Sequence, residues 1–226
     1  MMRWEDTPLE LIAVAGACSR SGKTALAATL LRALPAGAVA VKFTTTDDVF
    51  ERCPRGTPCV VCGIEVPYRI IQDPRVLAEA GTDTARLAEA GASRVLWVIA
   101  KQSAAQKAWA AVEARLAGEA VVVMEGSTVV DLSGPRLVLF VVHPFLCPSR
   151  WKPTTGRLLR RADVVIVNVP RGERRAPSMA VTAEIARHRG RDDARRADVT
   201  GPLADWAPDL ALRLSDRGRA RATARA

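Results

Sequence analysis

The feature that most restricts the fold of this chain is an apolar segment that leads directly into a glycine-lysine-threonine loop. Residues 11–17 are continuously apolar, as in a strand covered on both faces, and residues 18–24 read Cys-Ser-Arg-Ser-Gly-Lys-Thr. Residues 25–31 are mostly good helix formers. This order of strand, loop and helix is the context of a Walker A phosphate-binding loop, and it predicts an α/β protein.

The loop carries the groups that hold a phosphate chain. Its backbone N–H groups and the N-terminus of the following helix can surround the phosphates, Lys23 can bridge the β- and γ-phosphates, and the Thr24 hydroxyl can bind Mg²⁺. Ala17 replaces the first glycine of the motif G-x-x-x-x-G-K-[ST], with Gly16 one residue earlier, and alanine fits there if its φ is negative. The residues expected to bind the nucleotide in this loop are Ser19, Arg20, Ser21, Gly22, Lys23, Thr24 and Ala25.

Apolar segments of strand length alternate with amphipathic segments of helix length. The further expected strands are 38–44, 94–100, 121–125, 137–143 and 163–169, and the expected helices are 22–34, 83–90, 104–117, 154–161 and 179–188. The alternation predicts a single three-layer P-loop NTPase domain over residues 1–215, with a mostly parallel sheet and helices on both faces. Residues 46–82, with three cysteines and four prolines, are expected to be an insertion, and residues 216–226 a basic disordered tail.

Polar residues follow several expected strands, at the edge where parallel sheets bind ligands. Lys42 can face the γ-phosphate or an acceptor, and Asp47 and Asp48 can hold Mg²⁺, unless all three form only a solvated turn. Glu125 stands where a Walker B-type carboxylate belongs, and Asn168 can contact a purine base or cap the next loop. The expected catalytic residues are Lys23, Lys42 and Glu125, and the expected Mg²⁺ ligands are Thr24, Asp47 and Glu125.

Four motifs, taken in order, resemble those of the molybdopterin-guanine dinucleotide biosynthesis protein B family of P-loop proteins. They are the Gly22-Lys23-Thr24 loop, Lys42, the segment Asp83-Thr84-Ala-Arg86-Leu-Ala-Glu-Ala90-Gly91-Ala92 and the pair Glu125-Gly126. The resemblance covers residues 9–130. The wider group includes dethiobiotin synthetase and cobyrinate amidase-type ligases, in which an asparagine near the position of Asn168 contacts the purine.

The resemblance implies a GTP- or ATP-binding protein that uses Mg²⁺, forms a homodimer and assists a cofactor-assembly enzyme in attaching a nucleotide to molybdopterin. The chain departs from the family in having Phe43-Thr-Thr-Thr46 where histidines are usual, and in continuing well past His143. Two other functions use the same loop: a small-molecule kinase or ligase with its acceptor near Lys42 and Glu125, and a metal-handling NTPase.

The metal-handling alternative depends on three cysteines. Cys53, Cys59 and Cys62 have the spacing C-x5-C-x2-C, whose C-x-x-C pair can bind Zn²⁺ or an iron-sulfur cluster. A fourth ligand can come from Cys147, His143 or a partner subunit. The alternatives are a redox-active pair of Cys59 with Cys62, or a loop without metal.

Two further segments near the loop carry hypotheses. Cys18 lies beside Lys23 and a helix N-terminus, which predicts a lowered thiol pKa, unless the residue is only packed beneath the loop. Arg150 and Lys152 can receive an anionic group with Trp151 stacked on its ring, unless they belong to an ordinary surface loop.

The composition argues against two classes of partner. The net charge of +9 comes mainly from arginine, and aromatic residues make up only 4% of the chain, so the stacking platforms of a nucleic-acid-binding surface are missing. No apolar run reaches the roughly 18 residues that cross a bilayer, so we expect a cytoplasmic protein without membrane contact, whose thiols stay reduced.

The metal hypothesis makes a direct prediction. Protein purified without oxygen should hold about one Zn²⁺ or one iron-sulfur cluster per chain or per dimer, and Cys59→Ser should lose it because a thiolate ligand is removed. Elemental analysis with an absorption spectrum measures both quantities. Protein free of zinc and iron, with Cys59→Ser unchanged in stability, would contradict the hypothesis.

Overall fold

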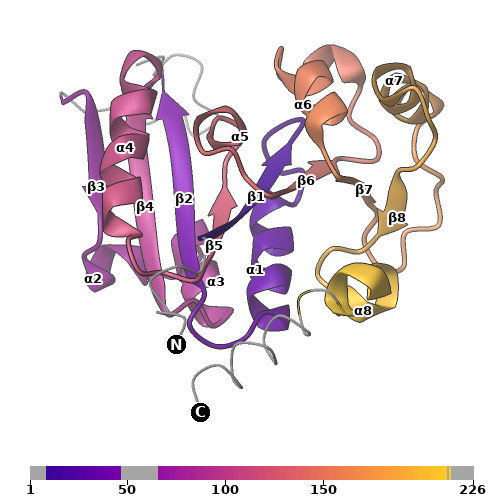
Figure 1. The fold of residues 1–226 in the computed structure, drawn as a ribbon. Coiled ribbons are helices and arrows are strands. Elements are labelled where there is room, and N and C mark those ends of the chain that lie inside the picture. The colour runs from indigo at the N-terminus through magenta and orange to yellow at the C-terminus, as the bar shows by residue number, and fades with distance from the viewer. Residues whose placement is uncertain (1–8, 47–65, 213, 215–226) are drawn as a thin grey trace, which may run out of the picture.

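The computed structural model describes residues 9–46, 66–212 and 214, and in these residues eight strands form one sheet (Figure 1). In spatial order the strands are β3 (Tyr68–Ile71), β4 (Arg94–Lys101), β2 (Val39–Thr46), β5 (Val121–Glu125), β1 (Glu10–Gly16), β6 (Leu137–Val142), β7 (Val164–Asn168) and β8 (Arg195–Ala197). Neighbouring strands are parallel except β3 and β4, which are antiparallel. The predicted α/β class with a mostly parallel sheet is confirmed.

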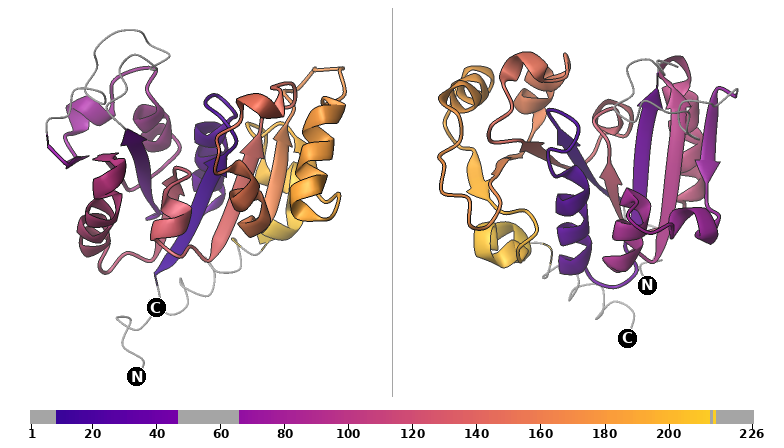
Figure 2. Two further views of the ribbon diagram at one scale, coloured as in Figure 1. Left: turned by 90° about the horizontal axis from the view of Figure 1, so that it is seen from above. Right: turned by 180° about the vertical axis from the view of Figure 1, so that it is seen from behind.

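Helices cover both faces of the sheet and make three layers (Figure 2). One face carries α1 (Lys23–Ala33), α2 (Pro74–Leu77), α3 (Asp83–Glu89) and α8 (Leu203–Trp206). The other carries α4 (Ala105–Arg115), α5 (Val129–Leu132), α6 (Thr155–Arg161) and α7 (Met179–Arg189), with the 3-10 turns η3 (Gln102–Ala104) and η4 (Pro148–Arg150). Along the described parts of the chain, no helix is both long enough and apolar enough to pass through a membrane.

The central strand β1 shows why the inner strands are continuously apolar. Ile12 and Val14 belong to the core beneath α1, whereas Ala13 and Ala15 belong to the core on the opposite face. Successive side chains of a strand point to opposite faces, so both sets must be apolar when helices cover both. The six inner strands therefore lie within two residues of the predicted boundaries.

Two edge strands were not predicted. β3 lies within the segment interpreted as an insertion, yet it pairs with β4 and extends the sheet. β8 is three residues long and contains Arg195 and Arg196. Each has a single neighbouring strand and polar or half-exposed side chains, so neither shows the apolar run that marks an inner strand.

Gly126, the residue after β5, passes unusually close to the neighbouring strand β2. Its N–H donates to the carbonyl of Val14 at 3.0 Å, its φ is +155°, and a Cβ added to it would lie 2.6 Å from the carbonyl oxygen of Phe43. Because the obstacle is backbone, it has little freedom to move. The glycine of the Glu125-Gly126 pair is thus required by the packing of two strands.

Gly126→Ala should lower the free energy of unfolding by about 2 kcal/mol or more, because the new methyl group would press on the β2 backbone. Gly118→Ala is the matched control: Gly118 also has positive φ, at +82°, but nothing lies within 4 Å of an added Cβ. We expect about 1 kcal/mol for that change. Urea unfolding measures both variants, and equal losses would contradict the steric explanation.

Candidate functional site

The predicted phosphate loop joins β1 to α1 at the carboxyl edge of the sheet. Gly22, at the N-cap of α1, has φ of +106°, and Arg20 has φ of +58°. Within the described ranges, Arg20 is the one non-glycine residue with positive φ, a conformation that costs on the order of 1–3 kcal/mol and concentrates at functional sites. Ala17 is buried and its φ is not positive, as alanine requires there.

The displaced glycine of the motif has a steric explanation. A Cβ at Gly16 would lie 2.6 Å from the hydroxyl oxygen of Ser21 and 2.9 Å from the carbonyl oxygen of Val141. Ser21 is fully buried, and its hydroxyl has no hydrogen-bond partner among the described residues. The loop folds tightly against the end of β1. The position without room for a side chain is therefore residue 16, a glycine, and not residue 17, an alanine.

A chain of polar contacts links the start of α1 to three other elements, β5, β2 and α3. The Thr24 hydroxyl donates to Glu125 Oε2 at 3.0 Å, and Lys42 Nζ donates to Glu125 Oε1 at 3.1 Å and to Asp83 Oδ2 at 2.6 Å. Glu125 is only 4% exposed. The structure thus brings together Thr24, Lys42 and Glu125, three of the residues singled out from the sequence, and adds Asp83.

Asp83 is a site residue that sequence reasoning missed. It opens α3, after Thr82 caps the helix by accepting the N–H of Ala85. The Asp83-Thr84 motif is part of the family resemblance, but the sequence does not show that Asp83 meets Lys42, 41 residues away. The motif itself was the signal that pointed to this position.

The charges of this cluster are mutually stabilised. Burial alone would lower the pKa of the Lys42 ammonium group, but the carboxylates of Glu125 and Asp83 outweigh burial and raise it. Burial would raise the pKa of Asp83, but Lys42, with help from Thr24 and Arg86, lowers it. Lys42 therefore stays a cation, unsuited to act as a base at neutral pH.

Lys23 lies at the start of α1 and donates to the carbonyl of Cys18 at 2.7 Å. Desolvation and the nearby Lys152 lower its pKa to about 8. This cation is therefore held beside another cation, and its one hydrogen-bond acceptor among the described residues is a neutral carbonyl. An anion bound in the loop would relieve both penalties.

Asn168, at the end of β7, ties the loop to the segment after β8. Its Nδ2 donates to the carbonyl of Ser21 at 3.1 Å, and its Oδ1 accepts the N–H of Val199 at 3.3 Å. A Cβ at Gly22 would lie 2.4 Å from Asn168 Nδ2, so the glycine makes room for the contact. In this structure Asn168 caps backbone groups of the loop before α1 and of the segment after β8, and not, as the capping prediction had it, those of the loop that follows it.

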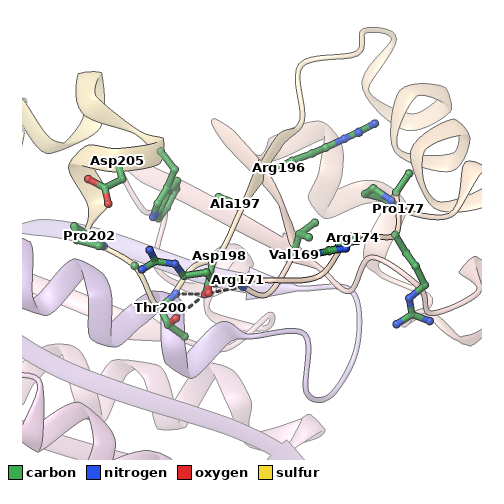
Figure 3. Close-up of a pocket in the computed structure, with 14 residues that line it drawn as sticks. Val169, Arg171, Arg174, Pro177, Arg196, Ala197, Asp198, Thr200, Pro202 and Asp205 are labelled. Carbon is green, nitrogen blue, oxygen red and sulfur yellow. Dashed lines mark hydrogen bonds between the residues drawn. The ribbon is translucent and has the colours of Figure 1, made fainter.

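A pocket of about 810 Å³ is lined by residues that follow β7 and by residues from β8 to α8 (Figure 3). Its lining includes Arg171, Arg174, Arg196 and Trp206. Asp198 connects two parts of the wall of this pocket (Figure 3). Its Oδ1 accepts hydrogen bonds from the backbone N–H and the hydroxyl of Thr200, and its Oδ2 accepts one from the backbone N–H of Arg171. The pocket has the size of a small-molecule site, and Val169, the residue after Asn168, is part of its lining.

Of the two hypotheses for Cys18, the structure favours the packed residue over the reactive thiol. Its side chain is buried, and burial raises the pKa of the thiol although Lys23, Lys152 and the backbone of His143 act in the opposite direction. The desolvation of a thiolate outweighs the lysine that the sequence placed beside it. Cys18 is the small packed residue of the alternative interpretation.

In the loop after β6, the structure argues against the stacking role of Trp151. Trp151 is half-buried, packs against the core and donates its indole N–H to the carbonyl of Leu146 at 3.2 Å, so its ring is not free to stack on a ligand. Arg150 is exposed. His143 Nδ1 accepts the N–H of Phe145, and Cys147 is exposed with a free thiol.

Several predicted residues lie outside the part of the chain that the structure describes. They are Asp47, Asp48, Cys53, Cys59 and Cys62, together with the predicted tail 216–226. The described residues contain no group of three or more histidine, cysteine, aspartate or glutamate side chains placed to hold a metal ion. The cysteine hypothesis therefore stays a prediction.

No protein-family model matches this sequence, and no curated protein matches it. The functional argument accordingly depends on the geometry of the site and on the motifs of the sequence.

Asp83→Asn should lower the free energy of unfolding at pH 7 by about 1 kcal/mol, because Asp83 is 41% exposed and solvent screens its ion pair with Lys42. The pKa of Asp83 is lowered in the folded protein, so its contribution is complete above the unfolded pKa of about 4 and is lost as the pH falls through the folded value. The difference in the free energy of unfolding between wild type and variant, measured with urea, should therefore shrink as the pH falls. A difference that stays constant from pH 7 to pH 3 would contradict this.

Proposed function

We propose that this chain binds a nucleoside triphosphate with Mg²⁺ through residues 19–25 and works as a P-loop NTPase or phosphotransferase. The observation that carries the proposal is the contact of 3.0 Å between the Thr24 hydroxyl and the Glu125 carboxylate, immediately after Lys23 at the N-terminus of α1. A hydroxyl, a buried carboxylate and a lysine at one helix N-terminus match the requirements of a metal-bound phosphate chain.

The loop supports phosphate binding by its charge and its polarity. The N-terminal turn of α1 contains no acidic residue, so its N–H groups and positive end are available to an anion. A phosphate oxygen would replace the Cys18 carbonyl as the acceptor of Lys23 and would form the stronger, charge-assisted hydrogen bond. The unpartnered Ser21 hydroxyl is a further polar group in this loop.

The donor set also fits Mg²⁺. Thr24 and Glu125 supply a hydroxyl and a carboxylate oxygen, the hard ligands that this ion prefers, and they lie next to the loop that would hold the phosphates. When bound, Mg²⁺ would neutralise charge on the phosphate oxygens and orient them. Asp47, the other predicted ligand, belongs to the undescribed segment.

Lys42 is proposed to stabilise charge on the transferred phosphoryl group. It reaches Glu125 from β2, and Asp83 holds it from the other side. Its raised pKa keeps it positively charged, so its role is electrostatic. The same position beside Glu125 favours a second candidate function, a small-molecule kinase or ligase whose acceptor would bind near Lys42.

The nucleoside is proposed to occupy the pocket that Val169 and Asp198 help to line, because Asn168 and Val199, their neighbours in the chain, are joined by a hydrogen bond and Asn168 also bonds the loop at Ser21. The biological role proposed from the motif resemblance is accessory: a homodimer that supports a cofactor-assembly enzyme in attaching a nucleotide to molybdopterin. The motifs Gly22-Lys23-Thr24 and Glu125-Gly126 support that role.

Lys23→Ala should weaken triphosphate binding by at least about 100-fold, because it removes charge-assisted hydrogen bonds to two phosphates. In wild type the affinity should also fall as the pH rises above about 8, where Lys23 loses its proton. Isothermal titration calorimetry with Mg²⁺ and non-hydrolysable ATP and GTP analogues measures both effects. Lys107→Ala, an exposed lysine on α4, is the matched control and should bind as wild type does. Tight binding by Lys23→Ala would refute the assignment.

A further inference from the structure

The loop between β6 and α6 is anchored directly on the phosphate loop. The N–H of Lys152 donates to the carbonyl of Ala17 at 2.8 Å, and the buried Thr155 hydroxyl donates to the same oxygen at 3.4 Å. Ala17 is the residue that replaces the first glycine of the phosphate-binding motif. These two hydrogen bonds therefore fix the position of the loop before α6 relative to the site.

The segment that leads to Lys152 is itself well supported. Trp151 donates its backbone N–H to the carbonyl of Pro148 at 3.0 Å, closing the turn η4, and its indole N–H to Leu146 at 3.2 Å. Its ring packs against the core. Because Trp151 is anchored, the backbone of Lys152 has a fixed position, as a residue that positions a ligand requires.

The ammonium group of Lys152 belongs electrostatically to the site. It interacts with Lys23, Lys42, Glu125 and Cys18, and desolvation is the main cause that lowers its pKa although the residue is exposed at its outer side. The two carboxylates of the cluster are both bonded to Lys42. Over the described residues, the Lys152 side chain has no hydrogen bond or ion pair, so three lysines share two carboxylates and a positive charge is left over.

The position of this charge indicates which phosphate it would meet. Lys152 interacts electrostatically with Glu125 and Lys42. Under the proposed function, Glu125 helps to hold Mg²⁺ and Lys42 faces the transferred phosphoryl group, which is the terminal phosphate. Lys152 would therefore meet the terminal phosphate.

We propose that Lys152 is a second phosphate-binding lysine, supplied by the β6–α6 loop of the same chain, that contacts the terminal phosphate of a bound nucleoside triphosphate. The assignment rests on the proposed function, and it explains why a cation is held without a partner beside two others. It also gives the site a means to prefer a triphosphate to a diphosphate, because only the triphosphate reaches Lys152.

The test compares triphosphate and diphosphate binding in Lys152→Met, which removes the charge and keeps most of the side-chain length. Both anchoring hydrogen bonds to Ala17 remain, since one uses the backbone of residue 152 and the other uses Thr155. Titration calorimetry with Mg²⁺, using non-hydrolysable ATP and GTP analogues beside ADP and GDP, should show a loss of about 10- to 100-fold for the triphosphate alone. Lys107→Met is the control and should show no change.

The outcomes separate the two proposals. If wild type binds neither the triphosphate analogues nor the diphosphates, the proposed function fails and the assignment of Lys152 fails with it. If wild type binds and Lys152→Met keeps the same preference for the triphosphate, the assignment alone is wrong. An equal loss for both ligands would also overturn it, and a thermal melt of the variant identifies a loss caused by unfolding.

Discussion

Glu125 is a carboxylate buried at the end of β5, and a charge in that position is stable because two other elements supply partners for it. Thr24 comes from the start of α1 and Lys42 from β2. Asp83, from α3, holds the second side of Lys42. Leaving such a charge without its cation costs about 3–5 kcal/mol, so this contact set helps to determine how the phosphate loop, β2 and α3 are placed.

The phosphate loop is held in shape by close contacts on both sides. Gly16 lies against Ser21 and the end of β6, and Gly22 lies against Asn168 at the end of β7. A loop fixed in this way has little conformational entropy left to lose when an anion binds. The strained backbone of Arg20 is consistent with a loop whose shape serves a ligand.

The sequence predicted best where a local pattern is imposed by burial. The inner strands and α1 were placed correctly, because a strand covered on both faces must be apolar throughout. β3 and β8 were missed because an edge strand with one neighbour tolerates polar side chains, as Arg195 and Arg196 show. The sequence left two roles open for Cys18, because it displays the neighbouring lysine but not the depth of burial that outweighs it.

By itself, the sequence determined the α/β class, the place of the loop between β1 and α1 and the residues at the ends of the inner strands, because hydrophobic periodicity and a contiguous motif are local properties. Only the tertiary structure decided that Asp83 meets Lys42 and that Asn168 caps Ser21, which lies 147 residues earlier. It also decided that the loop before α6 is hydrogen-bonded to the carbonyl of Ala17. Contacts of this kind join residues far apart in the chain, and they arise only when parallel strands bring their carboxyl ends to one edge of the sheet.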